Sequence, residues 1–457
     1  MKGFIQTLKN IWSIEELRNK ILFTLGILLV YRFGSYIPLP GIDLSAINTD
    51  ILNAKGNSSG GNGFLDILNA FTGGGFSRAS ILALGIMPYI SASIVVQLMG
   101  LALPYLQKLQ KEGESGRKKI TQITRWLTIA ICLVQAPAYL TSVTNFFLPY
   151  SDPSISAAYI ISPNSFWFWF PSTIILVTGT MFAMWLGEKI TDRGIGNGIS
   201  LLIMVGIMAD LPRSFVSEVQ LQSGIFILFE IIAFLAVILV SVILVQAVRQ
   251  VPVQYVGRAQ GGRSNYMKTF TNTVRQYIPL KVNAAGVMPI IFAQAIMFLP
   301  GVLANAIYNE GNIPRFFQDL SNPFSFTYCV VFGILIIIFT FFYTAVTIPV
   351  NQMAEDLRRN EGIIPRVKPG METANFLDDI LSKITLPGSI FLALLAILPA
   401  VVHLFGVSSS MALFFGGTSL IILVGVTLDT IQQINTYLLN HHYDGMMQTD
   451  RINKRMA

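Results

Sequence analysis

Ten long apolar runs constrain this chain more than any other feature of its sequence. Each run is bounded by charged residues or by proline and glycine, and each is long enough to cross the hydrocarbon core of a bilayer as a helix. Only 12% of the residues are charged and 53% are hydrophobic, which is too apolar for a soluble globular protein. The sequence therefore predicts an all-α integral membrane protein with ten transmembrane helices, near residues 21–39, 80–103, 126–148, 165–187, 196–212, 223–248, 282–304, 325–349, 386–404 and 412–437.

The basic residues are distributed unevenly between the two sides of these predicted helices. All but five of the 31 Lys and Arg fall in the segments that share a side with the N-terminus. Because cytoplasmic loops carry the excess of positive charge, this asymmetry places both termini in the cytoplasm and favours an even number of spans. The five exceptions are Arg32, inside the first span, and Lys55, Arg78, Arg213 and Arg315 on the opposite side.

Residues 1–20 precede the first span and lack the pattern of a cleavable signal. They carry Trp12, the acidic pair Glu15 and Glu16, and four basic residues, which is typical of an amphipathic helix at the membrane interface. We expect the first span to act as the insertion signal. Residues 438–457 are polar and are expected to form a cytoplasmic tail.

The stretch from Phe64 to Leu103 joins a short apolar helix to a span. The helix is about two turns long before three glycines, Gly73 to Gly75, end it, so it cannot cross a bilayer. The run 80–103 that follows has no charge and would extend for about 36 Å as a helix. It contains a proline break and a polar stripe, which fit either close helix packing or a polar pathway. These interrupting residues are Gly85, Pro88, Ser91, Ser93 and Gln97.

Two loops on the predicted cytoplasmic side are large and basic. The loop 249–281 has no acidic residue, and its Val251–Tyr255 run indicates one arm of a hairpin that turns near Gly261 and Gly262. A basic loop can serve as a topology signal that contacts anionic lipid, or it can bind a phosphate-rich partner such as ribosomal RNA. The candidate binding residues are Arg249, Arg258, Arg263, Lys268 and Arg275 in this loop and Arg358, Arg359, Arg366 and Lys368 in the loop 350–385.

No pattern in the sequence assembles an active site, a metal site or a cofactor site. The glycine-rich run 194–198 follows a helix and has no acidic residue about 20 positions later, so it indicates a helix break and not a phosphate cradle. Cys132 and Cys329 fall inside spans and imply no disulfide. Glu230 and Asp429 are the main acidic residues in spans, whereas an ion-coupled transporter would usually need an acid near the bilayer midplane.

Several motifs together resemble those of the SecY family, the channel subunits of the bacterial protein-conducting translocon. The motifs are IPLPGI at 37–42, FSRAS at 76–80, GIMPYISAS at 85–93, KEGESGR at 111–117, GIGNGIS at 194–200, PLKVN at 279–283 and FGGTSL at 415–420. The resemblance implies two inverted five-helix halves, residues 21–212 and 213–437, around a central hourglass pore. It implies a passive channel that translocates unfolded secretory polypeptides and releases apolar helices sideways into lipid.

The resemblance also implies roles for particular residues. The short helix before the second span corresponds to a plug, and the lateral exit lies between spans two and three on one side and seven and eight on the other. A narrow ring of isoleucines corresponds to the pore constriction, although isoleucine also packs generally in apolar helices. The family arginine before the Pro-Gly of the second basic loop is replaced by Lys368, so either Lys368 or Arg366 takes its role. The implied residues are Leu65, Ile67, Leu68, Phe71, Gly73, Gly74 and Gly75 for the plug; Gln97, Thr128, Gln135 and Asn283 for the lateral gate; and Ile90, Ile94, Ile203, Ile291 and Ile422 for the ring.

The partners that the resemblance implies are SecE, SecG, the motor ATPase SecA, the translating ribosome and precursor polypeptides. Membrane lipid is the surrounding solvent, and the bacterial inner membrane is the implied location. No enzyme activity and no cofactor are expected. The rival interpretations are an ion-coupled secondary transporter with inverted repeats and an intramembrane enzyme, and neither finds the ionisable site that it needs in the predicted spans.

Overall fold

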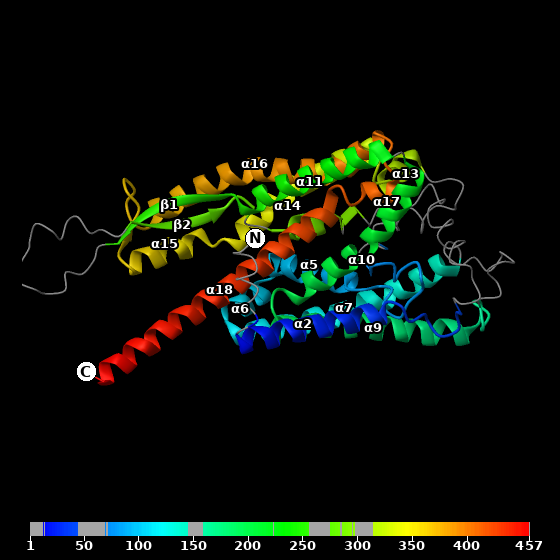
Figure 1. Cartoon of the computed structure of the whole chain (residues 1–457), viewed down its shortest axis with the longest axis horizontal. Helices are drawn as coiled ribbons and strands as arrows, with labels where there is room; N and C mark the ends of the chain where they lie inside the picture. The colour runs from blue at the N-terminus through cyan, green and yellow to red at the C-terminus, as the bar shows by residue number, and fades with distance from the viewer. Residues whose placement is uncertain are drawn as a thin grey trace, which may run out of the picture. The chain divides into compact units, whose positions relative to one another are not determined.

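The computed structural model describes residues 12, 14–43, 69, 72–144, 159–222, 224–255, 275–283, 286–294, 296–297 and 314–456. Most of these residues are helical, and the chain separates into two compact units, traced in Figure 1. Unit 1 comprises Met1–Ser223, Ser408–Phe414 and Gly425–Ala457, and unit 2 comprises Gly224–Val407 and Phe415–Val424. Each unit has an apolar core of its own.

Unit 1 is a bundle in which α7 contacts both α5 and α9, and α9 contacts α10. Its core gathers Phe76, Tyr139, Leu140, Phe168 and Leu176. Because lipid is as apolar as these side chains, close packing and hydrogen bonds, more than the hydrophobic effect, hold such helices together. The helices are α2 (Glu15–Gly34), α5 (Met87–Ala102), α6 (Pro104–Lys111), α7 (Glu114–Ser142), α9 (Phe166–Arg193), α10 (Gly198–Leu221), α17 (Ser409–Ala412) and most of α18 (Gly417–Met456).

Unit 2 is organised around the contact between α14 and α16, with side chains of α11 packed against their core. Much of the surface of α11 is exposed and apolar, as at Ile225, Phe229 and Ile232, which is the surface expected of a helix that faces lipid. The elements are α11 (Gly224–Gln246), β1 (Val248–Tyr255), β2 (Arg275–Lys281), α13 (Arg315–Ser321), α14 (Phe326–Thr347), α15 (Val350–Arg359), β3 (Gly362–Ile363), α16 (Met371–Leu404) and the first turns of α18.

The two large basic loops form a single folded region, which we call the sheet lobe: β1, β2, α15, β3 and the first turns of α16. The strands form one antiparallel sheet in the order β2-β1-β3, with Val251 opposite Ile278 and Gln254 opposite Ile363. Side chains from both loops share one core, listed by residue as Val251, Val253, Leu280, Leu357, Ile364, Leu377 and Leu381. Figure 1 shows this lobe at one end of the α14 and α16 pair. The predicted strand Val251–Tyr255 is confirmed, and the predicted turn at 261–262 lies outside the described residues.

The predicted apolar spans agree with the helices in type and approximate position. Within the described residues seven helices are long and apolar enough to cross a membrane, or eight if the sharply bent pair α5 and α6 counts as one span. The predicted span 196–212 is too short, because α10 continues through Pro212 to Leu221. Proline is tolerated inside membrane helices where neighbouring groups satisfy the freed carbonyl. In the predicted span 282–304, residues 284–285, 295 and 298–304 lie outside the described residues.

Within the predicted span 80–103, the helix starts later than expected. Residues 73–86 form successive turns, and α5 begins only at Met87 and has 16 residues. The cause is local: Gly85 has a φ of +54°, which is not helical, and Pro88 occupies the first turn of α5, where its missing N–H costs nothing.

Candidate functional site

The described part of the predicted plug is its glycine hinge. Thr72 Oγ1 donates to the Asn69 carbonyl at 3.2 Å and accepts from the Phe76 N–H at 3.0 Å, and the Gly74 N–H also donates to the Asn69 carbonyl, at 2.9 Å. Gly73 and Gly74 both have positive φ values, so the chain reverses here without strain. Leu65, Ile67, Leu68 and Phe71 lie outside the described residues.

The segment after the hinge is fixed to α7 and to the chain that follows α2. The Tyr139 hydroxyl on α7 donates to the Phe76 carbonyl at 2.7 Å. The Leu39 N–H donates to the Ala79 carbonyl at 2.8 Å, and the Ile81 N–H donates to the Ile37 carbonyl at 2.9 Å. These bonds satisfy backbone groups that a helix would have satisfied internally, which is why turns are stable at this depth in the bundle.

The five isoleucines of the predicted ring are distributed between the units. Ile90 and Ile94 lie one turn apart on α5 and are buried, as is Ile203 on α10. In unit 2, Ile422 on α18 is buried and Ile291 is half-buried. Their meeting in one ring stays a prediction.

The predicted lateral-gate residues differ in what their polar groups do. Gln97 donates to Ser93 Oγ on the same helix at 3.2 Å, and the fully buried Thr128 hydroxyl donates to the Thr124 carbonyl at 2.7 Å. Gln135 on α7 is half-buried. Asn283 in unit 2 is buried, and its Oδ1 has no hydrogen-bond partner in the part of the chain that the structure describes. Their common role at a gate stays a prediction.

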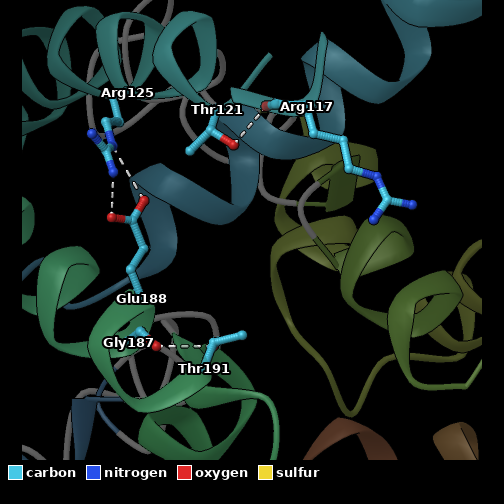
Figure 2. A network of polar contacts seen from close by, with 6 residues as sticks. All are labelled: Arg117, Thr121, Arg125, Gly187, Glu188 and Thr191. Atoms are coloured by element: carbon cyan, nitrogen blue, oxygen red, sulfur yellow. Dashed lines mark hydrogen bonds and ion pairs between the residues drawn. The ribbon is translucent and has the colours of Figure 1, made fainter. Parts of the chain in front are cut away.

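An ion pair that the sequence analysis did not identify joins α7 to α9. Arg125 donates from Nε to one carboxylate oxygen of Glu188 at 3.2 Å and from Nη2 to the other at 2.5 Å. Figure 2 shows these two side chains facing each other, whereas Arg117 points away from them. The side chain of Glu188 is only 19% exposed, so this two-point contact is partly desolvated. Complementary charges near the ends of adjacent spans were the only sequence signal for it.

The glycine-rich run 194–198 is a junction of four helices. Its Ile195 N–H donates to Thr24 on α2 at 3.1 Å, its Gly196 N–H donates to Gln433 on α18 at 2.8 Å, and its Gly198 N–H donates to Thr191 on α9 at 2.9 Å. Asn197 caps the N-terminus of α10. Since side chains already occupy these donors, the run does not cradle a phosphate, in agreement with the predicted helix break.

Three acidic residues of the described helices differ in their surroundings. Glu230 is buried in α11, and Asp429 is exposed on α18. A third acid, Glu218, was missed because the fifth span was predicted to end at residue 212. Glu218 is buried near the end of α10, where its carboxylate accepts from the hydroxyl and the N–H of Ser408. Among the described residues no three His, Cys, Asp or Glu side chains gather in a way that could hold a metal ion.

The basic residues of the sheet lobe lie on its surface. Arg249, Arg358 and Arg359 are exposed. Arg366 and Lys368 are exposed on the turn between β3 and α16, where Arg366 has a φ of +70° and Lys368 lies 3.7 Å from Glu372. Arg275 pairs with Gln254 in the strand register. Arg258, Arg263 and Lys268 lie outside the described residues.

Seven or eight helices within the described residues are long and apolar enough to cross a membrane, as expected of a multi-pass membrane protein. A model of the SecY family matches residues 80–431. Protein translocase subunit SecY of Streptomyces scabiei is 38% identical over 96% of this chain and 98% of its own length, and that of Thermotoga maritima is 38% identical over 98% and 99%. The chain belongs to the SecY family.

Solved structures show the same fold. A structure described as that of a protein conducting channel has a TM-score of 0.62 at 19% identity, and Sec61 in a canine ribosome-channel complex has a TM-score of 0.58 at 19% identity. Each comparison covers 91% of both chains. The predicted family is confirmed, and the protein is a polypeptide-translocating channel. Its family is one of translocation channels and is not a known enzyme family.

Proposed function

We propose that this channel carries unfolded secretory polypeptides across the bacterial inner membrane and releases apolar segments sideways into lipid, with both termini in the cytoplasm. The observation that carries the proposal is the match to protein translocase subunits over nearly the whole chain. The charge asymmetry of the sequence supports the orientation.

Two devices close the proposed pore. A constriction formed by Ile90, Ile94, Ile203, Ile291 and Ile422 excludes ions by dewetting, because a narrow ring of aliphatic side chains holds no continuous water. The plug, about residues 65–75, adds a second barrier. Burial of Ile90, Ile94 and Ile203 and the hydrogen-bonded glycine hinge support these assignments.

The proposed lateral gate opens beside α5 and α7, which pack against each other in unit 1. Gln97 and Gln135 are half-buried polar groups on these two helices, and Asn283 supplies a buried amide oxygen in unit 2. Thr128 contributes by shape, since its hydroxyl is already bonded within α7.

The proposed partners bind the sheet lobe, which faces the cytoplasm. Its exposed arginines suit SecA or the phosphate-rich surface of a ribosome, and two of the three strands carry residues of the basic loop 249–281. SecE and SecG are the proposed small membrane subunits. Arg366 is the better candidate for the family arginine, because Lys368 is close to Glu372, whereas no ion pair of Arg366 occurs in the described part of the chain.

A transport assay tests the function. The channel, reconstituted with SecE in liposomes and supplied with SecA and ATP, is expected to render a signal-bearing precursor resistant to added protease. A precursor without a signal should stay accessible. ATP-independent, ion-driven uptake of a small solute, with no protected precursor, would instead identify a secondary transporter.

A further inference from the structure

Three of the five basic residues that break the charge asymmetry of the sequence gather in one place in unit 1. Arg32 lies in the last turn of α2, Arg78 lies in the segment after the glycine hinge, and Arg213 lies in α10. All three interact electrostatically with the carboxylate of Asp210 on α10. Basic residues on the side opposite the N-terminus work against the positive-inside rule, and basic residues within spans are energetically costly. Their proximity therefore indicates that they have a specific function here.

Arg32 reaches the hinge directly. Its Nη1 donates to the Gly73 carbonyl at 2.9 Å, and its Nη2 donates to the Tyr36 hydroxyl at 3.3 Å. Its guanidinium carbon also lies 5.2 Å from the centre of the Tyr36 ring. One side chain therefore joins the end of α2 to the backbone of a segment about 40 residues later, through a charge-assisted bond.

Tyr36 receives a second cation. The guanidinium carbon of Arg78 lies 4.5 Å from the centre of the Tyr36 ring, within the range of a cation–π contact. Arg78 Nη1 is buried, and it has no hydrogen-bond partner among the described residues. Tyr36 thus links the cation that contacts the hinge to a cation carried by the chain just beyond the hinge.

The shape of the hinge matches this contact. Gly73 has a φ of +62°, and a Cβ atom built there would collide with Arg32 Nη1 and lie 2.9 Å from the Gly206 carbonyl oxygen on α10. The Gly73 peptide therefore fits between the guanidinium of α2 and the backbone of α10. A displaced hinge would lose its hydrogen bond to Arg32.

We propose that Arg32 is a positioning residue that latches the hinge at Gly73 and so holds the preceding plug in the closed channel. This inference rests on the plug of the proposed function. Tyr36 and Arg78 orient the latch. Loss of a hydrogen bond to a charged group shifts a two-state equilibrium by about 10- to 100-fold, which is the expected rise in the plug-displaced population.

The test compares three variants of the full channel in planar bilayers. Arg32→Met removes the charge and both donors, and we expect resting ion conductance to rise by about tenfold or more and precursors with defective signals to be transported. Arg32→Lys keeps the charge but loses the fork that reaches both acceptors, so its leak should be intermediate. Arg18→Met, on the same helix α2 but distant in sequence from the hinge, should behave as the wild type.

Wild-type conductance and signal stringency in Arg32→Met would overturn the latch, whether or not its thermal stability falls. If Arg32→Met does not fold, Tyr36→Phe decides, because it keeps the ring and removes only the hydroxyl acceptor. A leak below that of Arg32→Lys supports the latch, and no leak overturns it. Deletion of residues 65–75 and transport by the wild-type channel separate the questions: a leak in the deletion alone rejects the latch, and no transport by the wild type rejects the proposed function.

Discussion

Arg125 and Lys383 each form a short ion pair, but the two pairs differ in exposure. In the pair of Arg125 with Glu188 the side chains are 44% and 19% exposed, whereas in the pair of Lys383 with Asp379 they are 74% and 59% exposed. Arg125→Gln would leave the Glu188 carboxylate partly buried and unpaired. We expect the free energy of unfolding to fall by about 1–3 kcal/mol, measured by unfolding of the purified protein in detergent.

Lys383→Gln is the matched control, with an expected loss below about 0.5 kcal/mol because both partners stay solvated. A double variant that exchanges Arg125 and Glu188 should recover part of the loss. Equal effects of Arg125→Gln and Lys383→Gln would show that the α7 to α9 contact contributes no more than a surface pair.

Ile422 and Ile421 are adjacent in α18 and equally buried, but only Ile421 belongs to the core of unit 2. If Ile422 lines the constriction, Ile422→Asn should wet it, raise resting ion conductance and let precursors with defective signals pass. Ile421→Asn should instead lower thermal stability, because it buries an amide in the core, and leave conductance unchanged. Planar-bilayer recordings and melting curves of both proteins provide the measurement. A pair of variants with the same conductance would remove Ile422 from the ring.

At the scale of the element, the turn between β3 and α16 presents two candidates for one function. Arg366 is exposed in a left-handed conformation, and Lys368 is close to Glu372. Reversal of either charge to Glu should weaken SecA-driven translocation, and we expect Arg366→Glu to cost at least about tenfold more than Lys368→Glu, because only a guanidinium offers a planar fork to a carboxylate. The measurement is the rate of precursor protection in SecA-supplied liposomes.

Arg366→Gly controls for the backbone at this turn. Glycine adopts the positive φ without strain, so it removes the guanidinium while relaxing the turn. Translocation at the wild-type rate in Arg366→Gly would transfer the role to Lys368, and membrane insertion should be normal in all three variants.

For the whole molecule, the sequence predicted the features that depend on local composition. Long apolar runs form helices, and the run Val251–Tyr255 forms a strand, because nearby residues determine both kinds of secondary structure. The family motifs predicted which positions to consider at the pore. Pairings across long separations were not predictable: the bonds of the 194–198 junction to α2 and α18 join residues more than 170 positions apart.

Two errors share a physical origin in proline and glycine. Near Gly85 and Pro88 the chain forms turns where the start of the second span was expected. Pro212 was expected to end the fifth span, but it lies inside α10. Both outcomes depend on whether other segments supply hydrogen bonds to the freed backbone groups, which the local sequence does not record. Because the fifth span was expected to end at residue 212, Glu218 was not predicted to lie in a helix.

The strands of the sheet lobe come from both sides of residues 256–274: β1 precedes this segment, and β2 and β3 follow it. A protease cut there would leave β1 on one fragment and both of its neighbours, β2 and β3, on the other. The two fragments would then still be joined by a complete antiparallel ladder and by a shared apolar core. We expect the pieces to copurify after cleavage, and to reassemble into a working channel when produced as separate polypeptides. Fragments that part in mild detergent would show that the lobe needs its covalent link.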